Sequence, residues 1–466
     1  MSDKDIAPSH ADVTKAELYT YDGSAMWDYT AKITEFTIQQ SMNSLRYDGS
    51  LVCLDTEGLL ETIPLRGEET MKLTIKGHDL GTELNLDVRI YKISNIIPTE
   101  ANDGALYTLH FMSKAAWNAN KSVMVTSYKD DAAIIAKEIF DEYIAELKNE
   151  PESGHPKGGS SNRTLPFSTR RYKFKEDESR QFYIQPSSNS IKLTIPRLTP
   201  PSALHFVATK AYSSPSPSCT YRFFETLENY YFATDEFFIS DVKNDEIVNL
   251  FYAPTASNTQ EDATAQVNRI DNLKILSNGT DTISDINSGG YRNKIHEIDL
   301  VRKTVNLKQP IEFNYDDSKY IDMWGTARKS TDNPHTEQFR NDTFDLDNAK
   351  SFIVFKDYQS NGDLSSNLQS DRFLPQIIGN RVAYSHHLNS IVVSASLKGR
   401  IDLRPGQVAN LDIKTLSGHD GLNPIFSGRY LIQNTSHYRG TDDVLHTTIK
   451  LVKFDWSKGS TLEGGE

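Results

Sequence analysis

The fold can be inferred from one stretch near the end of the chain, Arg404-Pro-Gly-Gln407, followed by Val408-Ala-Asn-Leu-Asp-Ile413, Arg429-Tyr-Leu-Ile-Gln-Asn434 and His446-Thr-Thr-Ile-Lys-Leu451. Pro and Gly end one element, because Pro lacks a backbone N–H and Gly accepts turn conformations that other residues avoid. Three short runs with apolar residues at every second position follow, and this period is typical of half-buried β-strands. The stretch therefore predicts a unit of three antiparallel strands.

The same plan occurs near the beginning of the chain. Pro64-Leu-Arg-Gly67 precedes three runs of the same kind, Met71-Lys-Leu-Thr-Ile75, Arg89-Ile-Tyr-Lys-Ile-Ser-Asn95 and Tyr107-Thr-Leu-His-Phe111. The spacing agrees, since Gly67 to Arg89 is 22 residues and Gly406 to Arg429 is 23. Two copies of one antiparallel unit at the two ends of a long chain predict a duplicated β-barrel with other material inserted between.

These patterns predict an α+β protein that is mainly antiparallel β, with two duplicated barrels and an inserted mixed α/β domain. We expect the first barrel at 13–122 and the second at 265–315 together with 389–456, where Ile295, Ile298 and Leu300 can enter a strand. The inserted outer domain takes 123–264 and 316–388, including the basic Gly/Ser-rich loop near Gly158, and 457–466 forms a flexible tail.

The inserted region contains the clearest helical and aromatic patterns. Ser127 is a plausible N-cap of a helix with Asp130 and Asp131 in its first turn, where acidic side chains suit the helix dipole. A second helix starts at Thr199-Pro-Pro-Ser202, since Pro is tolerated at a helix start. The aromatic run Tyr221–Phe232 predicts a compact hairpin, and we expect it in the core of a small α+β domain.

Charge and cysteine content exclude some classes of protein. The net charge is −13, which disfavours a sequence-specific DNA binder but is compatible with a surface past which DNA slides without sticking. Cys53 and Cys219 are the only cysteines, and a free buried thiol in a reducing cytoplasm is the expectation for Cys53. No charged-then-apolar leader and no apolar run near 18 residues occur, so we expect neither export through a signal peptide nor a membrane span.

No established catalytic or phosphate-binding motif is present in the sequence. The weak candidates are an incomplete calcium loop, a scattered acidic group, an adjacent histidine pair and two carboxylates on one strand face: Asp285 to Gly289, Asp342 with Asp345 and Asp347, His386-His387, and Glu297 with Asp299. A plain turn, a solvated loop and ordinary strand positions explain them better. We therefore expect no catalytic residue, no cofactor and no metal.

Two stretches carry a resemblance to a known family. The first is Ala31-Lys-Ile-Thr-Glu-Phe-Thr-Ile38 with Gly49-Ser-Leu-Val-Cys-Leu-Asp55, Leu59 to Glu68 and Met71 to Ile75; the second runs from Leu403-Arg-Pro-Gly-Gln407 through Ser427 to Ile432 and His437 to Leu451. Together they cover the two outer thirds of the chain. In order and spacing they resemble the central baseplate hub protein of contractile-tailed phages and related injection machines.

This resemblance implies a homotrimer in which each subunit supplies two tube-like barrels, so that three chains present six. Such a ring joins the hexameric tail tube to the trimeric central spike and meets baseplate wedge proteins, while the tape-measure protein and DNA pass through its lumen transiently. It implies a place in the virion tail baseplate, after assembly in the host cytoplasm. The turn formed by Met42, Asn43, Tyr47, Asp48 and Gly49 would reach a neighbouring barrel and form a subunit interface.

Two other functions remain open from the sequence. One is a tail-associated cell-wall or polysaccharide hydrolase that uses Glu297, Asp299 or the acidic cluster near Asp345, although a glycosidase pair normally flanks a cleft and comes from different elements. The other is a receptor-binding adhesin module with the aromatic run Tyr221–Phe232 as its contact surface.

Overall fold

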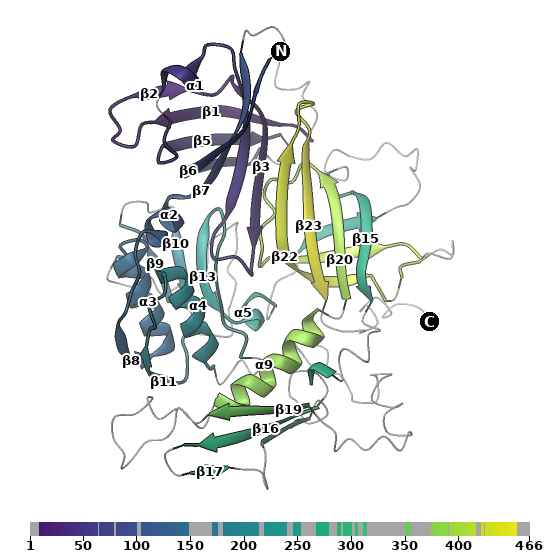
Figure 1. Cartoon of the computed structure of the whole chain (residues 1–466). Helices are drawn as coiled ribbons and strands as arrows, with labels where there is room; N and C mark the ends of the chain where they lie inside the picture. Colours follow the sequence, from purple (N-terminus) through teal and green to yellow (C-terminus); the bar gives the residue numbers. More distant parts are fainter. Residues whose placement is uncertain are drawn as a thin grey trace.

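The structure is a computed structural model, and it is mostly antiparallel β with several helices (Figure 1). It describes residues 9–63, 65–78, 81–99, 104–148, 170–175, 180–213, 219–239, 246–252, 267–278, 287–289, 292–300, 303–305, 311–314, 350–355, 374–389, 391–415, 421–423 and 425–453. The expected α+β class with mainly antiparallel strands is confirmed.

The N-terminal part of the chain forms one set of strands. They pair in the order β3-β4-β7-β6-β5-β1-β2. The bounds are β1 Ala11–Tyr19, β2 Met26–Asp28, β3 Ile33–Ser41, β4 Asp48–Asp55, β5 Thr70–Gly77, β6 Glu83–Pro98 and β7 Ala105–Ser113, with the short helix α1 at Leu59–Thr62. Alternate residues of these strands point into one apolar core that includes Phe36, Leu51 and Phe111. The period-two runs in the sequence therefore predicted this set correctly.

The C-terminal part forms a second set. Its strands pair in the order β15-β20-β23-β22-β21-β14. The bounds are β14 Val248–Tyr252, β15 Ile270–Asn278, β20 Ile391–Lys398, β21 Val408–Ile413, β22 Gly428–Arg439 and β23 Leu445–Lys453. The three strands predicted from the opening stretch of the sequence are confirmed as β21, β22 and β23, and they enclose a core of their own around Val393, Tyr430 and Leu451.

The two sets repeat the same order of five strands, β3-β4-β7-β6-β5 and β15-β20-β23-β22-β21. β3 and β15 are both 9 residues long, β4 and β20 are both 8, and β7 and β23 are both 9. β3 begins with the pair Ile33–Cys53 and skips one residue before the next pair. β15 begins with the pair Ile270–Leu397 and skips one residue at the same point.

A hydrogen bond and a second irregularity recur as well. The Ile90 N–H donates to the Glu69 carbonyl at 2.9 Å, and the Ile432 N–H donates to the Gln407 carbonyl at 2.9 Å. Immediately after Ile90 the pairing of β6 with β7 is bulged, and immediately after Ile432 the pairing of β22 with β23 is bulged. Bulges are retained as fixed features of a strand pair, so their matching places are informative.

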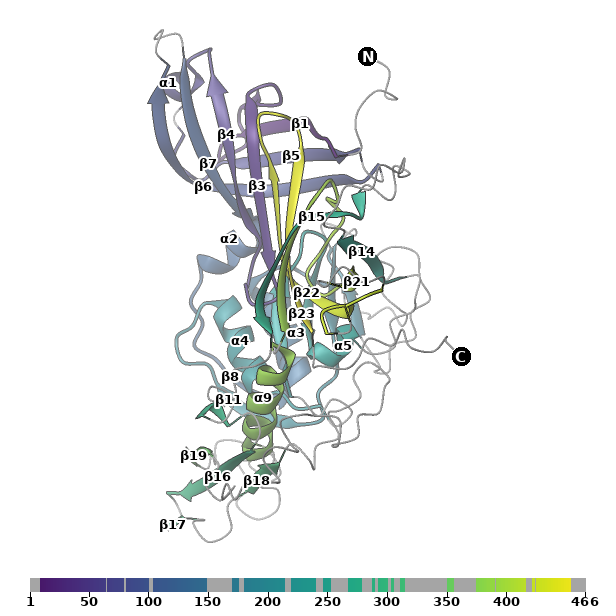
Figure 2. The same ribbon diagram turned by 90° about the vertical axis from the view of Figure 1, so that its right-hand side faces the viewer.

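Neither set closes into a barrel by strand pairing within the described residues. Instead β3 pairs with β22, and the two sets become one continuous open sheet in which the long strands of both run side by side (Figures 1 and 2). β22 is long enough, at 12 residues, to pair with β21 along its first part and with β3 along its second. The sets also differ in their sixth strand, because β1 pairs antiparallel with β5 whereas β14 pairs parallel with β21.

A third part packs beneath the first set and contains a mixed sheet and helices. The sheet order is β12-β13-β10-β9, and a separate pair is β11-β8. The bounds are β8 Ser127–Asp131, β9 Arg170–Lys173, β10 Gln181–Ile184, β11 Ser190–Thr194, β12 Arg222–Glu225, β13 Asn229–Ala233, α2 Lys114–Asn120, α3 Ala132–Tyr143, α4 Pro200–Lys210 and α5 Asp235–Ile239. Aromatic rings fill its centre, where Phe140 stacks on Phe182 with centroids 4.1 Å apart.

The expected second helix and aromatic hairpin are confirmed here as α4 and β12-β13, but the helix start predicted at Ser127 is wrong. Ser127 to Asp131 form strand β8, and the helix begins at Ala132 with Asp131 as its N-cap. The physical reason is tertiary pairing, because each residue of β8 pairs with one of β11 far along the chain. Such pairing overrides the local preference of acidic residues for a first helical turn.

A fourth part holds a small sheet under a long helix. Its strands are β16 Arg292–Asp299, β17 Thr304–Val305, β18 Ile311–Asn314 and β19 Lys350–Phe355, and the helix is α9 Leu374–Leu388. The expectation that Ile295, Ile298 and Leu300 enter the second barrel is wrong, because β16 pairs only with β17, β18 and β19 among the described residues. β16 is held against α9 instead, where the Asn293 side chain donates to the Gly379 carbonyl at 3.2 Å.

Candidate functional site

The candidate site is the junction at which β3 of the first set meets β22 of the second. The strands are antiparallel, with Ser41 opposite Asn434 at one end and Phe36 opposite Arg439 at the other. Backbone pairing continues into the turn after β3, because the Met42 N–H donates to the Gln433 carbonyl at 2.9 Å. The junction is therefore a continuation of the sheet rather than a contact between two finished domains.

Side chains reinforce this pairing. The Ser41 hydroxyl donates to Asn434 Oδ1 at 2.9 Å, and the buried Gln40 amide donates to the Thr435 hydroxyl at 3.1 Å. Gln40 also accepts the Leu227 N–H at 2.9 Å, which brings the mixed sheet to the same point. On the exposed side the Tyr438 hydroxyl donates to Glu35 at 3.1 Å.

An apolar cluster lies under the junction and joins all four parts of the molecule. Met42 follows β3, Phe224 belongs to the mixed sheet, Tyr384 and Leu388 belong to α9, and Leu431 belongs to β22. Phe224 also contacts Phe238 of α5, with ring centroids 5.4 Å apart. Because buried side chains from separate parts interdigitate here, moving one part would open cavities against the others.

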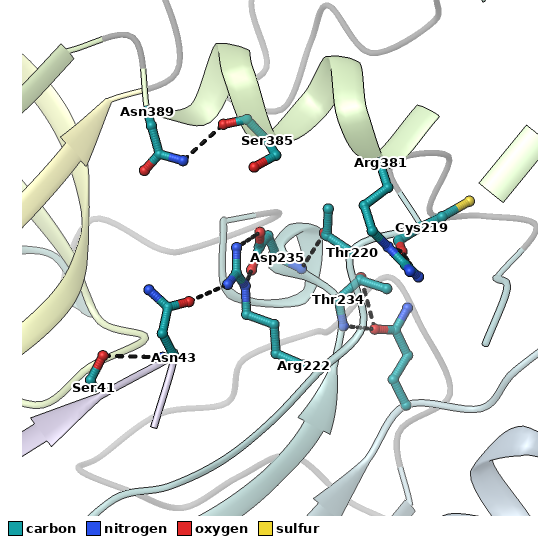
Figure 3. A network of polar contacts seen from close by, with 11 residues as sticks. Ser41, Asn43, Cys219, Thr220, Arg222, Thr234, Asp235, Arg381, Ser385 and Asn389 are labelled. Carbon is teal, nitrogen blue, oxygen red and sulfur yellow. Dashed lines mark hydrogen bonds and ion pairs between the residues drawn. The ribbon is translucent and has the colours of Figure 1, made fainter. Parts of the chain in front are cut away.

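A buried ion pair next to this cluster fixes the turn after β3 (Figure 3). Arg222 donates to both carboxylate oxygens of Asp235, at 2.6 and 2.9 Å, and its remaining nitrogen donates to the Asn43 side chain at 2.5 Å. Burial opposes the charge of Arg222, but the field of Asp235 and its hydrogen bonds outweigh that effect and raise the arginine pKa. Asp235 is completely buried, so this bidentate pair satisfies a carboxylate that water cannot reach.

A neighbouring arginine connects α9 to α4. The Arg381 guanidinium donates to the carbonyl of Cys219 at 2.7 and 2.8 Å and to the carbonyls of Thr209 and Ala208 at 3.0 and 3.2 Å (Figure 3 shows the Cys219 contact). Burial lowers the pKa of Arg381. Arg381 thus ties α9 to α4 and to the segment at Cys219 through backbone carbonyls.

A second polar network joins the end of β7 to the mixed sheet. Arg180 donates to Glu225 at 2.8 Å, the Ser113 hydroxyl donates to the other oxygen of Glu225 at 2.7 Å, and the Tyr230 hydroxyl donates to Glu225 as well. The Arg180 guanidinium lies over the Tyr230 ring, 4.8 Å from its centroid. Burial raises the pKa of Tyr230 well above its ordinary value, so the phenol stays a donor to Glu225.

The interface residues predicted from the sequence lie at this junction, with two of them inside the chain's own core. Met42 and Tyr47 are 2% and 1% exposed. Asn43 is exposed, and Asp48 and Gly49 are partly exposed. A Cβ atom at Gly49 would lie 2.2 Å from the Thr37 carbonyl oxygen, which explains the glycine there. A contact with another subunit from this turn is thus left to Asn43, Asp48 and Gly49, and it stays a prediction.

The residues of the rival functions are placed differently. Tyr221, Phe223, Phe224, Tyr230 and Phe232 are at most 5% exposed, so the aromatic run forms core and cannot be a contact surface. Its expected structural role is confirmed.

The carboxylates of the hydrolase alternative do not form a pair across a cleft. Glu297 and Asp299 lie two residues apart on the single strand β16, and Asp299 is 5% exposed. Within the described residues, no three His, Cys, Asp or Glu side chains come together in a way that could hold a metal ion. The other candidates lie outside the part of the chain that the structure describes: Asp285, Asp342, Asp345, Asp347, the loop near Gly158, the tail 457–466, and the side chains of His386 and His387.

Sequence reasoning missed two strand edges that the junction leaves open. Beyond Arg89, β6 continues to Pro98 with only β7 beside it among the described strands, and Ile96 and Ile97 are 55% and 56% exposed. β15 pairs along its length with one described strand, β20, while Phe251 of β14 bridges only Arg269, just before β15 begins. Leu276 of β15 is 50% exposed. The signal in the sequence was Ile96-Ile97-Pro98, because Pro within a strand pattern marks an edge.

The fold is shared with a solved tail protein. The chain has the fold of phage-tail proteins, and the predicted resemblance is confirmed at that level. It is similar to a tail protein from Neisseria meningitidis MC58, with 10% identity, a TM-score of 0.52, and coverage of 94% of this chain and 96% of that one. No family model and no curated protein matches the sequence.

Two further solved structures also align along nearly the whole chain. The 43 kDa tail protein of prophage MuSo2 from Shewanella oneidensis has 9% identity and a TM-score of 0.49, with 94% of this chain and 98% of that chain covered. A prophage tail protein from Listeria monocytogenes EGD-e has 9% identity and a TM-score of 0.42, with 94% of each covered.

No helix in the described parts of the chain is long and apolar enough to cross a membrane.

Proposed function

We propose that the chain is the structural baseplate hub of a contractile phage tail, with no enzymatic activity. In this role three copies form a pseudo-sixfold ring that joins the hexameric tail tube to the trimeric central spike, and DNA passes through after the spike is released. The observation that carries the proposal is the repeat of five strands in the same order, with the same bulge near the start of β3 and β15.

Symmetry explains why such a repeat is useful. Two similar modules in one chain let three chains present six similar units, so one face of the ring can match six tube subunits and the other can match three spike subunits. Among the described strands, the sheet has an open edge beside the second part of β6 and another beside β15. A head-to-tail interface between such edges forms a closed ring when the rotation that relates successive copies adds up to a full turn. A trimer presents six similar units and can also close into a ring.

The proposal assigns a role to each part of the chain. The two tube-like modules are 13–122 and the strands β14, β15 and β20–β23 within 248–453, while the helical and aromatic part between them forms an outer domain that meets wedge proteins. β16 to β19 belong with α9 in that outer region rather than with the second module. The net charge of −13 suits a lumen through which DNA and the tape-measure protein pass without stable binding.

Mass measurement in solution together with low-resolution imaging tests the proposal. We expect a homotrimer that appears as a threefold ring with six lobes. A hub can require its spike to trimerise, so a monomer is measured again with the cognate spike protein present. A compact monomer under both conditions overturns the proposal.

A further inference from the structure

Each strand set has an open strand edge at the place that corresponds to the junction between β22 and β3. β22 pairs with β21 along its first part and with β3 along its second. β6 stands at the same place in the first set and pairs with β5 up to Arg89, but its second part has only β7 beside it among the described strands. β15 stands at the place of β3, but where β3 pairs with β22 it has only β20 beside it among the described strands. Each set therefore carries one half of a similar junction, in which β6 has a further bulge between Ser94 and Ile97 and β15 has one between Ile275 and Ser277.

Equivalent positions on these strands follow from their pairing. Tyr438 of β22 lies opposite the second residue of β23, and Ile97 of β6 lies opposite the second residue of β7. Thr37 is the fifth residue of β3, and Lys274 is the fifth residue of β15, counted from the matching pairs that open both strands. Ile97 is thus the counterpart of Tyr438, and Lys274 is the counterpart of Thr37.

We propose that β6 of one copy pairs antiparallel with β15 of the next copy, in the register of β22 with β3. Tyr438 lies opposite Thr37 within the chain, so Ile97 lies opposite Lys274 of the next copy, and Pro98 opposite Leu273. This inference rests on the proposed function, and it adds the strands, direction and register of the subunit contact. The occupant of each open edge is a second copy of this chain.

Exposure and chemistry at the two edges agree with this pairing. Open edges that carry exposed apolar side chains invite association, and Ile96, Ile97 and Leu276 are each at least 50% exposed. The side-chain contact of the inner junction, Tyr438 to Glu35, is not repeated, because Ile97 and Asn272 occupy those positions. The contact between copies therefore depends on backbone pairing and apolar burial, and it is head-to-tail since each edge differs from the other.

Disulfide cross-linking in the full chain tests the register. The double variant Ile97→Cys with Lys274→Cys should give covalent dimers and trimers under mild oxidation. The control Ile97→Cys with Asn272→Cys places the thiols two residues out of register, where about tenfold less product is expected because diagonal neighbours lie too far apart for a disulfide. The variant Thr37→Cys with Tyr438→Cys reports whether this geometry permits a bond, within one chain. Cys53 and Cys219 are buried with pKa values raised to about 12, so they stay thiols.

A charge at the edge gives an independent readout. Ile97→Asp should shift the trimer toward monomer by at least about tenfold in association constant, since a buried carboxylate opposes pairing. Leu300→Asp, at a residue 66% exposed directly after β16, should leave the trimer intact. A trimer that gives no cross-link in the variant carrying Ile97→Cys and Lys274→Cys, and that tolerates Ile97→Asp, overturns the register and spares the proposed function. A chain that stays monomeric in every condition overturns both.

Discussion

Gln40 of β3 and Thr435 of β22 lie opposite each other at the centre of the molecule, and the Gln40 amide donates to the Thr435 hydroxyl at 3.1 Å across 395 residues of sequence. Both are 2% exposed. The same side chain accepts the Leu227 N–H, so one glutamine ties both strand sets and the mixed sheet together.

Replacing this glutamine should weaken the whole molecule. Gln40→Ala leaves the Leu227 N–H buried without its acceptor, and we expect a loss of about 1–3 kcal/mol in the free energy of unfolding. Urea denaturation measures it. The neighbouring Gln39→Ala, at an exposed position, should change stability by less than about 0.5 kcal/mol. Equal effects of the two variants would show that the junction is not held at Gln40.

Breaking the network around Glu225 should lower the free energy of unfolding more than Gln40→Ala does. Glu225→Gln leaves the Arg180 guanidinium without its carboxylate in a buried place, and we expect a loss of about 3–5 kcal/mol in unfolding free energy. Glu146→Gln is the matched control, because Glu146 pairs with Lys175 at 2.9 Å while both side chains are more than half exposed. That change should stay within about 0.5 kcal/mol. A mild effect at Glu225 would contradict the picture of a buried charge pair.

Stability should fall in mild acid because of His437. The pKa of His437 is lowered from 6.5 to about 3, mainly by burial and also by the charge of Arg404, while Asp402 acts in the opposite direction. As the pH falls below about 6.5, the His437 imidazole binds a proton in the unfolded chain but stays neutral in the folded chain. The free energy of unfolding therefore decreases as the pH falls from 6.5 toward 3. At pH 5 this loss amounts to about 2 kcal/mol.

Denaturation at pH 7.5 and pH 5 checks this dependence. His437→Gln should remove about 2 kcal/mol of the difference between the two pH values. His205→Gln, at an exposed histidine on α4, should keep the pH dependence of the original chain. If both variants behave alike, acid sensitivity has another source.

The proposed function also predicts the absence of hydrolysis. Purified protein should release no fragments from cell-wall or polysaccharide substrates, because Glu297 and Asp299 lie on one strand and do not face each other across a cleft. Turnover that disappears in Glu297→Gln would defeat the adaptor role in favour of an enzyme. Turnover that survives this substitution would indicate a contaminant or another site.

The sequence predicted the strand sets well because their signals are local. The pleat of a strand places apolar residues at every second position. Gly67 and Gly406 precede these runs because both adopt a positive φ, 81° and 92°. The start of the helix α4 also followed from such a pattern. The role of the aromatic run as core was predicted for the same reason.

Long-range pairing could not be predicted from one sequence. Nothing local in Ser127 to Asp131 reveals β11 as its partner, and nothing in Arg292 to Asp299 separates β16 from the second set. The ion pairs Arg222–Asp235 and Arg180–Glu225 could not be predicted either. Charged residues are mostly exposed, so the sequence alone gives no reason to expect these carboxylates to be buried.

The joining of the two sets by β3 and β22 has a mechanical consequence. Six residue pairs cross this seam, and the strands run lengthwise through it. A force pulling the sets apart along that direction loads all six pairs in shear at once, whereas a force across the strands would unzip them one by one. The seam between the two sets therefore resists separation best along the axis of its strands.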